Sequence, residues 1–195
     1  MSKARPGRPR SEKSRGAIIK ATHGLLNEKG GAGLNIEAIA RRAKVGKPTL
    51  YRWWPTLADL VLEVLLYQAD AEITILPRAS LRQTLRLFLR LSMKAIVDGA
   101  GAHLRFLMAQ AQQDEAFRKR FREGFTAKRR SALRSIFVQA VERGQMDSKH
   151  DLDLLVDLIF GAMWYRLLIG HARMDESFAD ALTGVMVRMV QTGPE

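Results

Sequence analysis

Apolar residues at helical spacing, on both sides of a short turn, constrain the fold of this chain more than any other feature. The apolar face of the first segment consists of Ile36, Ile39, Ala40 and Ala43. Lys44-Val45-Gly46 then makes a tight turn, in which Val45 points inward, and Leu50 holds the second segment onto the first. Two short helices joined by a turn that contains glycine are typical of a helix-turn-helix.

Local signals place the ends of these two helices. Asn35 is a good N-cap for the first helix, which we expect at residues 36–43. Pro48 suits the first turn of the second helix, where its missing N–H costs nothing, and we expect this helix to run to about Trp54. Its outward-facing side chains are Lys47, Thr49, Tyr51 and Arg52. In a helix-turn-helix these are the side chains that reach base edges in the DNA major groove.

The rest of the chain also has the pattern of helices, so we predict an all-α fold. Further helices are expected at residues 12–29, from 57, and at about 80–98, 103–112, 114–143, 151–170 and 175–191. The predicted domains are a flexible basic arm (1–11), a three-helix helix-turn-helix DNA-binding domain (12–56), a connecting helix (57–76), and a helical ligand-binding and dimerisation domain (77–195).

The positive charge of the chain is concentrated in its first quarter. Residues 1–55 hold 13 Lys and Arg against three Glu, a net charge of +10, whereas the whole chain carries +12. A local basic excess attracts polyanions through counterion release, nucleic acid first and an anionic membrane second. The chain has no cysteine, and its apolar runs are too short to span a membrane, so we expect a cytoplasmic, nucleoid-associated protein without a membrane partner.

Residues 35–60 resemble the TetR family of bacterial transcriptional regulators. The matching positions are Ile36, Ile39, Ala40, Ala43, Val45, Pro48-Thr49-Leu50-Tyr51, Trp54 and Leu60, with a Gly7-Arg8-Pro9-Arg10 arm before them. The resemblance implies a dimeric repressor that binds a palindromic operator and is released by a small-molecule effector. Two alternatives remain open: a DNA-binding regulator that has no effector or acts as an activator or with a co-repressor, and a helical interaction protein that does not bind DNA.

The resemblance also implies which residues contact DNA. Lys47, Pro48, Thr49 and Tyr51 match the start of the family's recognition helix, and Lys47 has the chemistry to pair with guanine O6 and N7. Tyr51 and Trp53 match positions that grip the backbone, Asn35 approaches phosphate, and Arg52 reaches phosphate too. Arg5, Arg8 and Arg10 are expected in the minor groove. The chain departs from the family at Leu57, where many members have a phosphate-binding Lys or Arg.

A homodimer is expected from the helix at residues 151–170, which is apolar nearly all round and must be buried on more than one side. By resemblance, this helix and the last one form a four-helix interface with their symmetry mates. The predicted interface residues are Leu155, Leu158, Ile159, Gly161, Leu182, Met186 and Met189.

The family's effector cavity lies in the second domain. Its predicted lining is Phe88, Leu91, Phe106, Met108, Phe125, Trp164 and Tyr165, with His103 as a polar group. Methionine and aromatic side chains suit an apolar or amphipathic effector, although the same side chains also fill ordinary cores.

Catalysis is not expected, and neither is a cofactor or a metal. The four histidines, His23, His103, His150 and His171, lack the spacing of metal ligands. The sequence contains no Gly-rich phosphate loop, nucleophile elbow or paired-carboxylate arrangement. The predicted function is therefore binding rather than chemistry.

Overall fold

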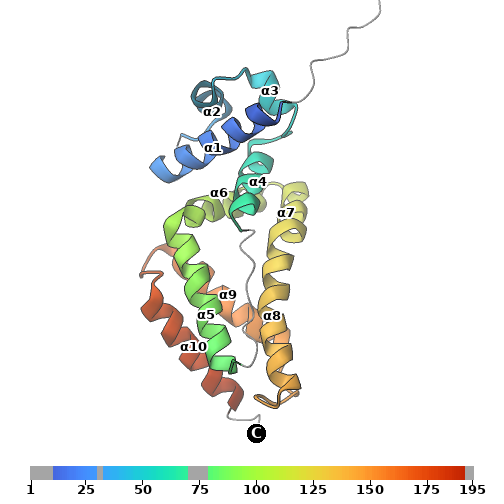
Figure 1. Ribbon diagram of the computed structural model, residues 1–195, viewed down its shortest axis with the longest axis vertical. Coiled ribbons are helices and arrows are strands. Elements are labelled where there is room, and N and C mark those ends of the chain that lie inside the picture. The colour runs from blue at the N-terminus through green and yellow to red at the C-terminus, as the bar shows by residue number, and fades with distance from the viewer. Residues whose placement is uncertain (1–10, 30–32, 70–78, 192–195) are drawn as a thin grey trace, which may run out of the picture. The chain divides into compact units, whose positions relative to one another are not determined.

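The predicted all-α fold is confirmed by the computed structural model, which describes residues 11–29, 33–69 and 79–191. Across those ranges the chain forms ten α-helices and two short π-helical turns, with no β-strand (Figure 1). None of the helices in the described ranges has both the length and the apolar character that crossing a membrane requires. The chain divides into two compact units, Met1–Val64 and Leu65–Glu195.

The first unit packs three helices and the start of a fourth around one apolar core. Its helices are α1 (Glu12–Lys29), α2 (Ile36–Ala43), α3 (Lys47–Tyr51) and the beginning of α4 (Leu57–Ala69). Side chains from all four meet in the core; the fully buried ones include Ile18, Ile39, Leu50 and Leu60. The short helices α2 and α3 are thus held by burial against α1 and α4, because isolated helices of this length are unstable in water.

The second unit is a helical bundle. Its elements are α5 (Leu81–Ala95), η1 (Ile96–Ala100), α6 (Gly101–Gln113), α7 (Glu115–Phe121), η2 (Arg122–Thr126), α8 (Ala127–Glu142), α9 (Leu152–Ile169) and α10 (Glu176–Gln191). Helix α5 packs against α8 and α10, and α8 packs against α9 (Figure 1). Together α5, α8, α9 and α10 supply most of the unit's core.

Two glycines set the corner between α5 and α6. Gly99 has φ 132°, a value that other residues rarely adopt, and the helix axis bends there. A Cβ atom on Gly101 would lie 2.8 Å from the carbonyl oxygen of Ile96, so this turn also needs a residue without a side chain. The predicted gap before His103 is wrong, because α6 begins directly at Gly101.

The predicted long helix at 114–143 is interrupted by the π-helical turn η2, from Arg122 to Thr126. Asp114 caps the start of α7, since its side chain accepts a hydrogen bond of 3.0 Å from the N–H of Phe117. A π-helical turn is wider than an α-helical turn, but its backbone stays helical. The periodicity of the sequence therefore does not reveal it.

An ion-pair cluster ties α10 to α5. The carboxylate of Asp180 accepts hydrogen bonds of 2.5–2.8 Å from the guanidinium groups of Arg86 and Arg90. Arg90, with Arg86 beside it, holds the pKa of Asp180 well below its usual range. The ion pairs of Asp180 with Arg86 and Arg90 are therefore intact at neutral pH. Their contribution to stability is full above the ordinary pKa of an aspartate and is lost as the pH falls from there through the lowered pKa of Asp180.

A matched pair of substitutions on α5 tests how the bundle is oriented. Leu89 is fully buried and Leu91 is 48% exposed, so the same chemical change should have different effects at the two positions. We expect Leu89→Ala to lower the free energy of unfolding by about 2–5 kcal/mol, and Leu91→Ala by less than about 1 kcal/mol. Urea denaturation at one fixed protein concentration measures both. Equal losses for the two variants would contradict the orientation of α5.

Candidate functional site

The start of α2 is fixed by the predicted cap. The side-chain oxygen of Asn35 accepts a hydrogen bond of 2.8 Å from the N–H of Ala38. This bond satisfies one of the backbone donors that a helix leaves unpaired at its first turn. The predicted N-cap is confirmed, and the Asn35 side chain is therefore already engaged.

The turn between α2 and α3 is short because Lys44 adopts a left-handed conformation, with φ 54° and ψ 45°. The next residue, Val45, donates its N–H to the carbonyl oxygen of Ala40 at 3.0 Å, which closes the end of α2. The Val45 side chain is half-buried against the core of the first unit. The predicted inward position of Val45 is confirmed.

Helix α3 is anchored by Leu50, which is fully buried in the same core. Pro48 stands in its first turn, as predicted. The helix ends at Tyr51, earlier than the predicted end at about Trp54. The N–H groups of Trp53 and Trp54 both donate to the carbonyl oxygen of Leu50 at 2.9 Å, so the chain forms a tighter turn there.

The outer face of α3 is basic and aromatic. Lys47, Pro48 and Arg52 are exposed, and Tyr51 is 55% exposed. Lys47 and Tyr51 lie one helical turn apart, so their side chains project from the same face. Thr49 is half-buried rather than fully outward. A cation and a phenol on an exposed face are suited to contacts with bases and phosphates.

An acidic side chain that sequence reasoning missed is paired with Lys47. The Lys47 ammonium group donates a hydrogen bond to the carboxylate of Glu37, in the first turn of α2. This hydrogen bond raises the pKa of Lys47 and lowers that of Glu37. The ion pair thus holds the Lys47 side chain in place across the turn. To contact an anion, the ammonium group must break its hydrogen bond to Glu37 or use its other N–H donors.

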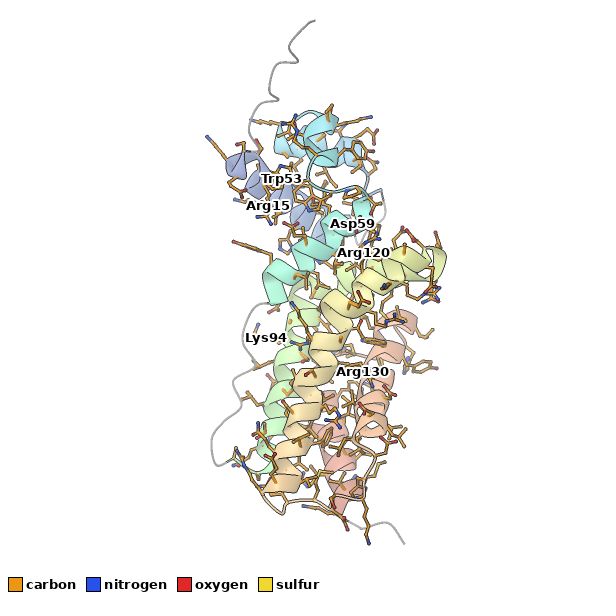
Figure 2. The ribbon with its side chains drawn as sticks, turned by 90° about the vertical axis from the view of Figure 1, so that its right-hand side faces the viewer. Arg15, Trp53, Asp59, Lys94, Arg120 and Arg130 are labelled. Atoms are coloured by element: carbon orange, nitrogen blue, oxygen red, sulfur yellow. The ribbon has the colours of Figure 1, made fainter. Side chains whose placement is uncertain are left out.

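A second network fixes the segment after α3. The indole N–H of Trp54, which is buried, donates to Glu63 on α4 at 2.7 Å, and Glu63 also accepts from Arg15 on α1. The guanidinium group of Arg15 also lies 5.5 Å from the ring centre of Trp53 (Figure 2). The partly buried Trp53 is therefore held by its neighbours, and its predicted contact with the DNA backbone stays a prediction.

Two of the sequence expectations concern the ends of this region. Arg5, Arg8 and Arg10, predicted in the minor groove, lie outside the described residues.

Leu57 is the first residue of α4, which Thr56 caps by accepting a hydrogen bond of 3.1 Å from the N–H of Asp59. The backbone N–H groups of this helix start are the groups that could hold a phosphate where the chain lacks a basic side chain.

Comparison with known proteins decides the family. A family model described as "Bacterial regulatory proteins, tetR family" matches residues 18–64, and one described as "Tetracyclin repressor-like, C-terminal domain" matches residues 77–186. The chain belongs to the TetR family. It is a helix-turn-helix transcriptional regulator, and regulators of this family are not enzymes.

Individual TetR-family relatives agree over most of the chain. It is 29% identical over 172 residues to the regulator YdeS of Bacillus subtilis, covering 88% of this chain and 87% of YdeS. It is 30% identical over 148 residues to the regulator AqdR of Rhodococcus erythropolis, covering 75% of this chain and 70% of AqdR. The crystal structure of the TetR family regulator SCO0332 matches with a TM-score of 0.72 and 29% identity, covering 90% of this chain and 97% of that one.

The residues predicted to line the TetR-family effector cavity fall into two groups. Phe88 and His103 are buried; Phe106, Met108, Phe125 and Trp164 are half-buried. His103 Nδ1 lies 2.9 Å from the carbonyl oxygen of Gly99, which can only accept, so this nitrogen carries a proton. For these six residues, the role in ligand binding stays a prediction.

The prediction is wrong for the other two cavity residues. Leu91 is 48% exposed and Tyr165 is 61% exposed, so neither lines the interior of the second unit. On α5 the inward face carries Phe88, Leu89 and Ser92, and Leu91 lies on the opposite side. Both residues are apolar or aromatic, which is why the sequence predicts them in the cavity. The sequence does not show which face of each helix packs towards the interior.

The predicted dimer residues also divide. Leu158, Gly161 and Met189 are exposed and so remain available to a second copy. The prediction is wrong for the other four, which are buried in the protomer's own core: Leu155, Ile159, Leu182 and Met186. Because α9 is apolar nearly all round, its sequence did not distinguish the face packed inside the protomer from the face left outside.

The outer face of α9 carries an apolar stripe that the sequence analysis only partly identified. The residues of this stripe, spaced alternately four and three apart, are Leu154, Leu158, Gly161, Tyr165 and Leu168, all exposed. Such spacing is that of a helix that packs along another helix. Exposed apolar side chains in a contiguous row mark an interaction surface.

The Glu37–Lys47 pair can be tested directly by NMR. In the DNA-free protein we expect the pKa of Lys47 to lie above its ordinary value, and to fall back towards it in Glu37→Gln, because the substitution removes the charged acceptor. A pH titration of the Lys47 side-chain resonances measures both values. Glu28→Gln is the control, since it removes one acidic charge from the same unit but one that pairs with Arg42. An unchanged Lys47 pKa in Glu37→Gln would contradict the pairing.

Proposed function

We propose that this chain is a dimeric, effector-responsive repressor that reads a palindromic operator with α3. The observation that carries the proposal is the exposed face of α3, where Lys47 and Tyr51 project side by side from a helix anchored by the buried Leu50. The N-terminal residues of the second helix of a helix-turn-helix are those that meet base edges. Arg41 and Lys44 are also exposed and add positive charge around the turn.

In this proposal the roles follow the predicted division of the chain. Residues 12–56 read DNA, residues 57–76 connect, and residues 77–195 dimerise and bind the effector. Two copies place their recognition helices about 34–36 Å apart, which matches one turn of DNA. An effector that binds better to a conformation with a different spacing shifts the population away from the operator-bound state. A 100-fold loss of operator affinity corresponds to a coupling of about 2.7 kcal/mol.

Operator binding is tested by fluorescence anisotropy on DNA from upstream of the protein's own gene, at two salt concentrations. A random duplex of equal length is the control. We expect discrimination of about 10³ or more between the two duplexes, together with a salt dependence for both. Equal binding to both duplexes that disappears at the higher salt concentration would argue against autoregulation, and genome-wide site selection then decides whether a specific operator exists.

Substitutions on α3 test which residues read the operator. We expect Lys47→Ala and Tyr51→Ala each to lower operator affinity by about 5- to 150-fold, because each removes a specific contact of about 1–3 kcal/mol. Lys20→Ala, which removes an exposed positive charge from α1, is the control for net charge and should have a smaller effect. Circular dichroism verifies that the variants are folded. Operator affinity that survives the double substitution of Lys47 and Tyr51 would show that another element reads the DNA.

The dimer is proposed to form through the exposed apolar stripe of α9, with Val185 and Met189 of α10 as further exposed apolar side chains. A Cβ atom on Gly161 would meet nothing within 4 Å in its own protomer, so the surface of α9 is open at this position. Because glycine has no side chain, the backbones of two α9 helices can approach each other closely there. This surface replaces the four buried residues of the sequence prediction. It is continuous along α9 from Leu154 to Leu168.

Sedimentation velocity tests this surface. We expect the unmodified protein to sediment as a dimer of 21.9 kDa chains, and Leu158→Glu as a monomer, because the substitution places a charge in the middle of the apolar stripe. Gln112→Glu adds the same charge at an exposed polar position of α6 and should remain dimeric. The monomeric variant should also lose operator affinity, since it can occupy only one half-site at a time. A dimer that persists in Leu158→Glu would place the interface elsewhere.

A further inference from the structure

An aromatic row runs along one face of the helical segment that includes α7, η2 and α8. The rings of Phe117 and Phe121 stack with centres 6.2 Å apart, and those of Phe121 and Phe125 with centres 5.7 Å apart. These residues are four positions apart in the sequence, and the next position in the row is Arg129. One step further along is Leu133, which is fully buried. Arg129 therefore occupies a position where the neighbouring turns carry apolar, inward-facing side chains.

The surroundings of Arg129 are mainly apolar. Its guanidinium carbon lies 5.3 Å from the ring centre of Phe88, and its Nη2 donates a hydrogen bond of 2.8 Å to the hydroxyl of Ser92, both on α5. Phe88 and Ser92 are themselves buried, and the Arg129 side chain is half-buried between the two helices. This burial lowers the pKa of Arg129, because the charged form loses contact with water.

Arg129 has no counter-charge in the part of the chain that the structure describes. Among the described residues no carboxylate forms an ion pair with it, whereas its neighbour Arg130 pairs with Asp157 and lies 3.8 Å from Asp153. A guanidinium group has five N–H donors, and only one contact with an oxygen acceptor is made here. No fully buried side-chain nitrogen or oxygen in the described part of the chain lacks a hydrogen-bond partner. The remaining donors of Arg129 thus lie where solvent or a small molecule can reach them.

A half-buried charge without a counter-charge is unfavourable, and an oxyanion is the counter-charge that a guanidinium fork fits best. We propose that the second unit binds an amphipathic anion: its carboxylate or phosphate group binds Arg129 and Ser92, and its apolar body packs against Phe125. This proposal rests on the proposed effector-responsive function and gives the chemical class of the effector. It also gives Phe125, at the end of the stacked row, a contact with the ligand rather than with the core alone.

Isothermal titration calorimetry on the full chain tests this site with three probes of equal chain length: decanoate, decyl phosphate and 1-decanol. We expect the anions to bind at least about tenfold more tightly than the alcohol, because a hydrogen bond to a charged group contributes more than one to a neutral group. The ratio between decanoate and decyl phosphate distinguishes a carboxylate ligand from a phosphate ligand. In the unmodified protein, decanoate should also raise the Tm, whereas 1-decanol at the same concentration should raise it less.

Arg129→Gln should lower the affinity for the anions about tenfold or more and leave the affinity for 1-decanol unchanged. Lys128→Gln is the matched control, because it removes the same charge from an exposed neighbouring position of α8 and should bind the anions normally. Arg129→Lys keeps the charge without the fork and should give an intermediate affinity. Anions that bind no better than 1-decanol to the unmodified protein, or equally well to Arg129→Gln, would overturn the proposal and leave Arg129 as a structural contact to Phe88.

Operator binding by the same variants separates this inference from the proposed function. Arg129→Gln should bind the operator like the unmodified protein in the absence of a probe. If operator binding is intact and the anions do not bind, the ligand class is wrong while the DNA-binding function stands. If the unmodified protein does not distinguish an operator from random DNA, the proposed function fails whatever the calorimetry shows.

Discussion

The DNA-reading face depends on the burial of Leu50 in the apolar core of the first unit, to which Ile39 of α2 also belongs. Helix α3 has only five residues, so its backbone hydrogen bonds alone cannot hold it in water. One buried side chain, one left-handed residue at Lys44 and one proline in the first turn together set its direction. Lys47 and Tyr51 face outward because Leu50 faces inward. Loss of that apolar contact would change the direction of every side chain proposed to read bases.

The same reasoning accounts for the second unit, where packing leaves two features unused. The bundle buries one face of α9 and leaves an apolar stripe exposed on the other, which a second copy of the chain could cover. Arg129 lies half-buried between α5 and α8, and no carboxylate of the described residues pairs with it. Each feature is unfavourable in an isolated, unliganded protomer. Dimerisation and binding of an anionic effector would each satisfy one of them, so both proposals come from groups that the protomer leaves unsatisfied.

Local signals in the sequence were sufficient for most of the fold. The cap at Asn35 and the proline at Pro48 each act within about one helical turn, and both were predicted correctly. The pairs that hold the site were not visible, because their members are distant in sequence: Glu37 lies ten residues before Lys47, and Arg15 lies 48 residues before Glu63. No spacing rule predicts contacts of this kind without knowledge of how α1, α2, α3 and α4 pack around one core.

The interior and the interface were the hardest parts to predict. Helix α9 has apolar residues on all sides, so periodicity could not separate Leu155, in the core, from Leu158, on the surface. The same ambiguity put Tyr165 in the predicted cavity although it is exposed. The half-buried position of Arg129 could not be predicted for a different reason. It stands in a run of charged residues, Lys128-Arg129-Arg130, which has the composition of a solvated helix face, and only the contacts with Phe88 and Ser92 distinguish it from its neighbours.

Methylation interference on the operator tests the central claim most directly, because methylation of guanine N7 blocks contacts in the major groove alone. We expect two groups of sensitive guanines, related by the symmetry of the site and centred about 34–36 Å apart, or a multiple of that spacing, on one face of the duplex. In Lys47→Ala, sensitivity at the guanines that Lys47 contacts should disappear from both groups. A single sensitive group, or the same pattern in the Lys47→Ala variant, would contradict a dimer that reads DNA with two copies of α3.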